Sequence, residues 1–310
     1  MDLHQIEYIV AIAQEQNIAK AANRLFLTQS ALNQQLLRLE RELGVALFER
    51  KNRMMIPTYA GRIYLESAEK ILDIRKETYK ILQDVAKEDA GEISIAYTPE
   101  VGSRMFFVIY PVFHQKYPKV TFRIREVRVK KMEQLLIQRE VELANLSYFE
   151  FSRNPELDYI NVDEECMVLG LPASHPLAYL AGERSYETLP QLDLTLLKED
   201  SFVMLGKATR MRDLAELAFT HAGFTPKILF ETTSTQTLVD MVCAQVAPAF
   251  FPQSYVRPDY PVVYFTVAPH KKWMRSVGFL KGTYLTKPEK YLIALVIDYF
   301  HGQLKKSRGI

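Results

Sequence analysis

The chain has 310 residues, 48% of them hydrophobic and 25% charged, so it can bury the cores of two or three globular units. Its 39 basic and 37 acidic residues leave a net charge of only +2, which excludes a polycation that coats nucleic acid non-specifically. The sequence shows no export signal and no run approaching the roughly 18 apolar residues of a membrane span. We therefore expect a soluble, cytoplasmic protein with no membrane partner.

Two short helices are predicted at the start of the chain. Apolar residues recur at spacings of three and four from Leu3 to Ala13, as they do on one face of a helix. A second helix is expected after Asn17, whose side chain can accept hydrogen bonds from the first backbone N–H groups. Residues 26–27 would then form a turn.

The third predicted helix begins after Thr28, another capping residue, and ends at Gly44. Four leucines step along it toward a core, namely Leu32, Leu36, Leu39 and Leu43. The opposite face carries hydrogen-bonding side chains, namely Gln29, Ser30, Asn33, Gln34 and Arg38. Asn and Gln can grip adenine through N6 and N7 in the major groove, and hydroxyl groups at a helix N-terminus suit phosphate. We therefore expect this face, with Thr28, to bind DNA.

A basic tip, Arg50-Lys51-Asn52-Arg53, precedes a short apolar strand and Pro57, which predicts a two-stranded wing. Lys51 and Arg53 would attract the DNA backbone or the minor groove, whereas Arg50 could instead pair with a core carboxylate. A helix of roughly 30 residues follows Thr58, too long to be buried in a small domain. We expect it to link the domains and to pair with a partner chain in a homodimer.

From Gly91 onward, strands alternate with amphipathic helices, which predicts an α/β fold with a parallel sheet covered on both faces. The expected strands are residues 92–97, 120–127, 166–171, 201–205, 228–232 and 246–251. The expected helices are residues 101–116, 130–139, 211–222, 235–245 and 287–304.

Ligands of such sheets bind beyond the carboxyl ends of the strands. One turn there offers Thr98, Glu100 and Ser103, and a second offers Lys207 and Thr209. The wall could be completed at later strand ends by Val129, Asn145 and Thr233. Hydroxyl groups, a lysine and free helix N–H groups favour a small anionic metabolite, but Glu100 argues the other way. The effector could therefore be anionic or zwitterionic.

No catalytic motif is found, because GxSxG, P-loop and GxGxxG patterns do not occur. The scattered histidines His114, His175 and His221 lack the spacing of metal ligands, and Cys166 and Cys243 are expected to be buried thiols. We expect neither enzymatic activity nor a metal or cofactor.

These features make the chain resemble the LysR-type transcriptional regulators over essentially its whole length. The strongest matches are residues 21–25 (AANRL), 28–36 (TQSALNQQL) and 39–50 (LERELGVALFER), supported by 58–61 (TYAG), 172–178 (PASHPLA) and 222–224 (AGF). Ser30 stands where the family usually has proline and Gln34 where it usually has arginine, which implies an unusual operator preference. Residues 244–248 also depart from the family's Gly-rich strand entry, which puts the geometry of a ligand loop in doubt.

The resemblance implies a sensor like a periplasmic substrate-binding protein, with two α/β subdomains hinged about a cleft and the second inserted into the first. The implied parts are a winged helix-turn-helix (1–58), a linker helix (59–88) and an effector domain (91–310), divided into subdomain I (91–161 and 266–310) and subdomain II (162–265). Such a protein binds a double-stranded DNA operator under allosteric control by a small-molecule effector, as a tetramer of two dimers. Two alternatives stay open, namely a ligand receptor and a cytosolic enzyme, each on the same bilobal fold without a DNA role.

Overall fold

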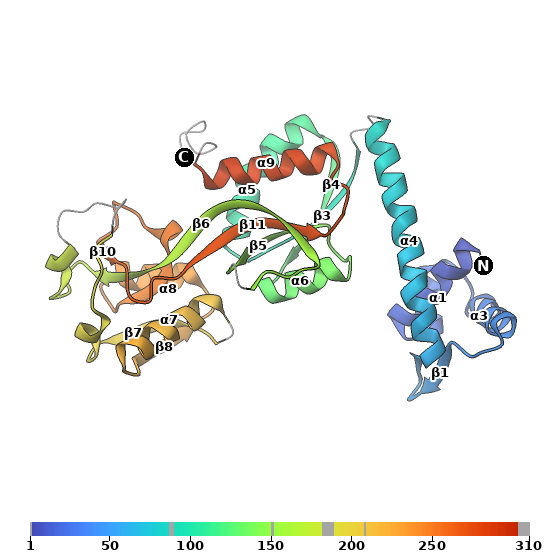
Figure 1. Cartoon of the computed structure of the whole chain (residues 1–310), viewed down its shortest axis with the longest axis horizontal. Coiled ribbons are helices and arrows are strands. Elements are labelled where there is room, and N and C mark those ends of the chain that lie inside the picture. Colours follow the sequence, from blue (N-terminus) through green and yellow to red (C-terminus); the bar gives the residue numbers. More distant parts are fainter. Residues whose placement is uncertain (1, 87–89, 150–151, 182–188, 208, 303–310) are drawn as a thin grey trace. The chain divides into compact units, whose positions relative to one another are not determined.

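The computed structural model of the chain describes residues 2–86, 90–149, 152–181, 189–207 and 209–302. The chain divides into two compact units, Met1–Glu88 and Asp89–Ile310 (Figure 1). The first is a winged helix-turn-helix that continues into a long helix, and the second is a two-lobed α/β domain. The predicted fold class is confirmed.

The N-terminal unit is built as the capping residues indicate. Its elements are α1 (Leu3–Glu15), α2 (Ile18–Arg24), α3 (Gln29–Leu43), β1 (Phe48–Lys51), β2 (Met54–Pro57) and α4 (Tyr59–Val85). The side chain of Asn17 accepts from the backbone N–H groups of Ala19 and Lys20, which starts α2. Gly44 ends α3 with a φ of 72°, a conformation that glycine adopts without a steric penalty. β1 and β2 pair antiparallel as the predicted wing.

The core of this unit is formed by α1, α2, α3 and the first half of α4. Its fully buried members include Ile6, Ile9, Ile12, Leu32, Leu36, Leu39 and Leu47, against which Leu65 and Ala68 of α4 pack. An ion pair between Glu7 and Arg75, 2.5 Å from Oε1 to Nη2, also ties α1 to α4. The prediction that Leu43 faces this core is wrong, because Leu43 ends α3 where the chain turns away, and its side chain is exposed.

The second unit alternates strands and helices as predicted, with most boundaries within a few residues. Its elements are β3 (Ala90–Tyr97), α5 (Val101–Lys116), β4 (Lys119–Glu126), α6 (Val129–Ile137), β5 (Leu143–Tyr148), β6 (Leu157–Pro172), η2 (Ala178–Ala181), η3 (Leu194–Leu197), β7 (Ser201–Leu205), α7 (Arg210–Ala222), β8 (Lys227–Thr232), α8 (Thr235–Cys243), β9 (Ala249–Pro252), η4 (Gln253–Tyr255), β10 (Val262–Phe265), β11 (Lys272–Leu280) and α9 (Lys287–Phe300). The last residues of the predicted final helix, 303 and 304, lie outside the described residues.

The strands form one mixed sheet in the order β4-β3-β5-β11-β6-β9-β7-β8, with β10 also paired to β6. β3 runs parallel to β4 and β5, and β7 runs parallel to β8 and β9, as the βαβ rhythm predicts. The expectation of a wholly parallel sheet is wrong at the centre, where β6 pairs antiparallel with β11, β9 and β10. β6 is also much longer than predicted, because the charged residues at 163–165 interrupt the apolar pattern that would indicate a strand.

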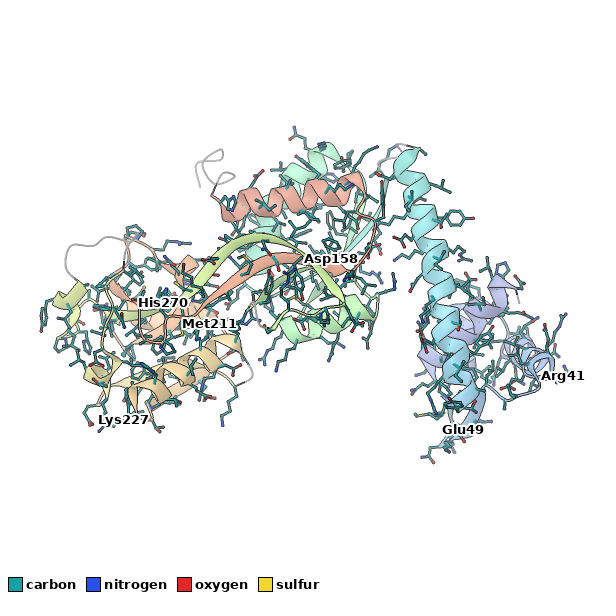
Figure 2. The ribbon with its side chains drawn as sticks, viewed as in Figure 1. Arg41, Glu49, Asp158, Met211, Lys227 and His270 are labelled. Atoms are coloured by element: carbon teal, nitrogen blue, oxygen red, sulfur yellow. The ribbon has the colours of Figure 1, made fainter. Side chains whose placement is uncertain are left out.

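Each lobe has its own pair of cores, where lobe I comprises β3, β4, β5, α5, α6 and α9, and lobe II comprises β7, β8, β9, β10, α7 and α8. In lobe I, α5 and α9 cover one face of β3 and β5, and α6 covers the other. In lobe II, successive residues of β6 and β7 point to opposite faces of the sheet. One set packs on α7 and the other on α8, so these helices cover opposite faces. β6 and β11 run through both lobes, and Figure 2 labels Asp158 and His270 toward opposite ends of this ribbon.

The two cysteines differ in burial. Cys166 is buried as expected, but Cys243 is only partly buried, and the two thiols are not bonded to each other. None of the helices in the described part of the chain is both long and apolar enough to cross a membrane.

Candidate DNA interface and effector site

The polar face predicted on α3 lies at the surface of the N-terminal unit. Gln29, Ser30, Gln34 and Arg38 are exposed, and Asn33 is half-buried. Thr28 caps the helix by accepting from the N–H group of Ala31 at 3.2 Å. The face is not purely polar, since Leu37 is 47% exposed beside these residues.

The wing places its basic tip in solvent. Asn52 and Arg53 turn the chain with positive φ angles of 49° and 64°, and Arg53 is exposed. Lys51 lies 2.7 Å from Glu49, Nζ to Oε1, in an exposed ion pair that stabilises little and can exchange for a phosphate contact. Arg50 also stays exposed.

The wing is held to α3 through its backbone. The carboxylate of Glu40 on α3 accepts from the N–H groups of Leu47 and Phe48 at 2.7 and 3.1 Å. This core carboxylate is therefore occupied by amides, and the alternative in which Arg50 pairs with a core carboxylate finds no support among the described contacts.

Phe26, in the turn before α3, is an exposed aromatic residue. The sequence did not single it out as a candidate contact. Its side chain is 97% exposed and its φ is 57°, in the left-handed region that bulky residues rarely adopt. It occupies the turn between α2 and α3, two residues before the cap of α3.

In lobe I, the first predicted effector turn leads into α5. The carbonyl oxygen of Thr98 accepts from the N–H group of Gly102, and Thr98 itself is half-buried. The Ser103 hydroxyl donates to Glu126 at 2.9 Å, so it is engaged within its own lobe. The Glu100 carboxylate reaches lobe II and accepts from the N–H group of Thr235 at 3.0 Å. The turn therefore contacts the second lobe, at the start of α8.

The second turn leads into α7, and Thr209 caps that helix by accepting from the N–H group of Arg212 at 3.2 Å. Lys207 and Thr233 are exposed on their turns. Val129 is the first residue of α6 and packs on the adjacent core. The expectation that Asn145 ends a strand is wrong, because it lies inside β5 with its amide 3.4 Å from the sulfur of Met105.

Arg210 is a residue between the lobes that the sequence reading missed. It is the first residue of α7, and its Nη1 donates to the Ser147 hydroxyl of lobe I at 2.5 Å. Its guanidinium also lies 5.2 Å from the ring centroid of Phe149. A cation in the first turn of a helix opposes the helix dipole, and that position could have singled it out.

The charge of Arg210 is poorly compensated by the residues that the structure describes. Burial lowers its pKa, and the negative charges of Glu133 and Asp213 only oppose that shift. Neither carboxylate forms an ion pair with it. Burial likewise raises the pKa of Glu133 on α6, against the nearby charges of Arg210 and Lys130. A guanidinium and a carboxyl group, both disfavoured in their charged forms, therefore belong to the two facing lobes.

Other titratable groups have structural contacts. His175 lies 3.0 Å from Asp200, Nε2 to Oδ1, while its Nδ1 accepts from the N–H group of Leu177. Within the described ranges, His, Cys, Asp and Glu nowhere gather in a group that could hold a metal ion.

Taken together, an exposed polar recognition helix, a basic wing and a two-lobed α/β domain define a DNA-binding transcriptional regulator with an effector-binding domain. The family model described as "Bacterial regulatory helix-turn-helix protein, lysR family" matches residues 3–62. The model described as "LysR substrate binding domain" matches residues 86–298. The chain belongs to the LysR family of transcriptional regulators.

The similarity to known proteins covers nearly the whole chain. The uncharacterized HTH-type transcriptional regulator YybE of Bacillus subtilis is 25% identical over 301 residues, covering 97% of this chain and 99% of the relative. A full-length OxyR variant from Pseudomonas aeruginosa has the same fold, with a TM-score of 0.64 at 23% identity, covering 96% of this chain and 94% of that one. Full-length CbnR in complex with its target DNA is similar at a TM-score of 0.51 and 22% identity, covering 96% and 99%.

Proposed function

We propose that the exposed face of α3 contacts operator bases through Gln29, Asn33 and Gln34. Thr28, Ser30 and Arg38 contact phosphates in this proposal, and the wing supplies Lys51 and Arg53. The observation that carries it is a capped helix whose exposed side bears amide groups able to pair with adenine. CbnR, a protein of the same fold, was solved on its target DNA, which supports the arrangement.

Base contacts and phosphate contacts can be separated by titrating an operator and a scrambled duplex at two salt concentrations. Gln34→Ala changes which bases are preferred, with a cost of about 1–3 kcal/mol at the contacted position. Arg53→Ala weakens binding to both duplexes and reduces the salt slope by about one, since one phosphate contact is lost. Glu66→Ala, on exposed α4, is the control and should change neither. Equal, sequence-independent losses in the first two variants would refute the assignment.

We further propose that an effector binds between the lobes, with Arg210 as the anchor of an acidic group. The poorly compensated guanidinium carries this proposal, because a partly buried charge without an ionic partner is costly and an anionic ligand relieves that cost. Glu133 on the facing helix suits an ammonium group, so the ligand is anionic or zwitterionic. Thr98, Val129, Lys207, Thr209 and Thr233 would form the surrounding wall.

The proposed division of labour keeps the boundaries suggested by the sequence, with DNA binding in 1–58, a linker in 59–88 and the effector domain in 91–310. The second half of α4 carries exposed apolar residues, namely Ile74, Tyr79 and Leu82, which suit a homodimer seam. Tetramer formation is proposed from the family alone. We also propose that the protein regulates without catalysing a reaction, in the cytoplasm, where a regulator meets its operator.

A size measurement tests the seam. Leu82→Glu places a charge on the exposed stripe and should shift the protein from dimer or tetramer to smaller species in sedimentation. Glu66→Gln, an exposed change elsewhere on α4, should leave the sedimentation unchanged. An oligomer that is insensitive to Leu82→Glu would exclude this part of the helix as the interface.

A further inference from the structure

A carboxylate of lobe I sits on the end of a helix of lobe II. Oε2 of Glu100 accepts from the backbone N–H group of Thr235, the first residue of α8, at 3.0 Å. The N–H group of Thr237, two residues further along α8, instead donates to the Ser234 hydroxyl of the same lobe. Glu100 therefore occupies the position at which the N-terminus of α8 would hold a bound anion.

The backbone of Glu100 is strained in a way that aims this side chain. Its φ and ψ are 65° and −75°, and the N–H group of Val101 bonds to the carbonyl oxygen of Pro99 at 2.9 Å. This is the γ-turn with positive φ, a rare and strained conformation. The Glu100 side chain makes no capping bond to its own helix α5 and bonds instead to lobe II.

Two further groups surround the same position. Arg104, one turn along α5, donates to Gln236 of α8 at 3.3 Å, and its guanidinium lies 5.7 Å from the ring centroid of Tyr255. Tyr255 is only 5% exposed, and its hydroxyl makes no well-formed hydrogen bond although Thr235 lies beside it. Burial and the charge of Glu100 raise the pKa of Tyr255 to about 12, so the hydroxyl stays a donor.

We propose that the N-terminus of α8, the Arg104 guanidinium and the Tyr255 hydroxyl form an oxyanion site that the chain fills with its own Glu100 carboxylate, latching lobe I to lobe II. The site takes a carboxylate or phosphate group once Glu100 has left. It is separate from the Arg210 site, which involves α6, α7 and β5, and it does not depend on the effector proposed above.

Tethering explains why the internal carboxylate prevails. A group held by a short stretch of chain has an effective concentration in the millimolar range or above, so free oxyanions at lower concentration do not displace it. Removing the carboxylate should therefore do two things together. It frees the amide of Thr235, and it allows inorganic phosphate to bind there.

Hydrogen exchange on the full-length protein tests both effects, with inorganic phosphate as the probe and chloride at equal ionic strength as its control. In Glu100→Ser without phosphate, exchange at residues 235–236 should rise about tenfold or more, since a charge-assisted hydrogen bond is lost. Added phosphate should restore the protection in Glu100→Ser and change nothing in the unmodified protein. Exchange along β7, in the core of lobe II, reports whether the variant remains folded.

Ser103→Ala is the matched control, because it removes a hydrogen bond of the same helix turn that stays within lobe I. It should leave the exchange of α8 unchanged. Unaltered exchange in Glu100→Ser would overturn the latch, and increased exchange without recovery in phosphate would overturn the oxyanion site. Loss of protection along β7 as well would show that Glu100 maintains the fold, which also overturns the proposal. None of these results depends on effector or DNA binding, so a failure here is distinct from a failure of the proposed function.

Discussion

Arg210→Met should change the stability of the effector domain by no more than about 2 kcal/mol while removing its response to carboxylates. The variant gives up a hydrogen bond to Ser147 and a ring contact with Phe149, together about 2–4 kcal/mol. It also removes a poorly compensated charge, whose desolvation opposes folding. These contributions oppose each other, so we expect a net change within about 2 kcal/mol.

Arg212, two residues along α7, supplies the contrast. Its side chain is buried, and its guanidinium binds the carboxylates of Glu216 and Glu231, each at 2.6 Å, and the carbonyl oxygen of Leu205 at 2.9 Å. Arg212→Met leaves these acceptors without a donor, and we expect a loss of about 2–4 kcal/mol. For a unit of this size that corresponds to a fall in melting temperature of roughly 4–16 °C.

The assay is thermal unfolding of the full-length protein, alone and with a panel of small carboxylates and amino acids. At least one carboxylate should raise the melting temperature of the unmodified protein and have no such effect on Arg210→Met. A fall in the apo melting temperature of Arg210→Met as large as that of Arg212→Met would refute the reasoning, because Arg210 would then be a structural residue with adequate partners.

Three further outcomes follow from burial and backbone geometry. Leu36→Ala, on the core-facing side of α3, should lower the free energy of unfolding by about 2–5 kcal/mol, measured by chemical denaturation. Phe26→Asn should stabilise the N-terminal unit by up to about 1 kcal/mol, because Asn tolerates a positive φ; a simultaneous loss of operator affinity would assign the exposed ring to DNA. Burial raises the pKa of Cys166 and of Cys243, so less thiolate is present at pH 7–8 than in a free thiol. Alkylation of the native protein by iodoacetamide should be slow and should speed up on unfolding; rapid labelling at pH 7 would contradict the assigned burial.

The sequence predicted best where local chemistry determines the structure. The caps at Asn17 and Thr28 and the glycine at position 44 mark helix ends by hydrogen bonds within a few residues, and all three act as expected. The central antiparallel strands escaped prediction because their pairing is long-range. Along 163–165, charged side chains interrupt the apolar pattern, yet Asp163 and Glu165 both pair there with Arg275 of β11, a residue more than 100 positions away.

The same difference between local and long-range structure applies to the candidate sites. The proposed DNA face follows from helix periodicity, since Leu32, Leu36 and Leu39 of α3 face the core and the polar residues between them lie toward the surface. The effector wall depends on how two lobes meet, which periodicity does not encode. The sequence therefore did not predict that Ser103 and Asn145 bond within lobe I, or that Arg210 reaches across to lobe I.

The contacts that Glu100 and Arg210 make between the lobes differ in what they leave for a ligand. On the side of α8, the carboxylate of Glu100 already satisfies the helix N-terminus, so an acidic group of a ligand gains little there. On the side of α7, Arg210 has a hydroxyl and an aromatic ring as neighbours, and an acidic group would supply the charge they lack. An effector with one acidic group should therefore bind at the Arg210 side without disturbing the latch. A ligand whose second acidic group displaced Glu100 would bind at the expense of that contact between the lobes.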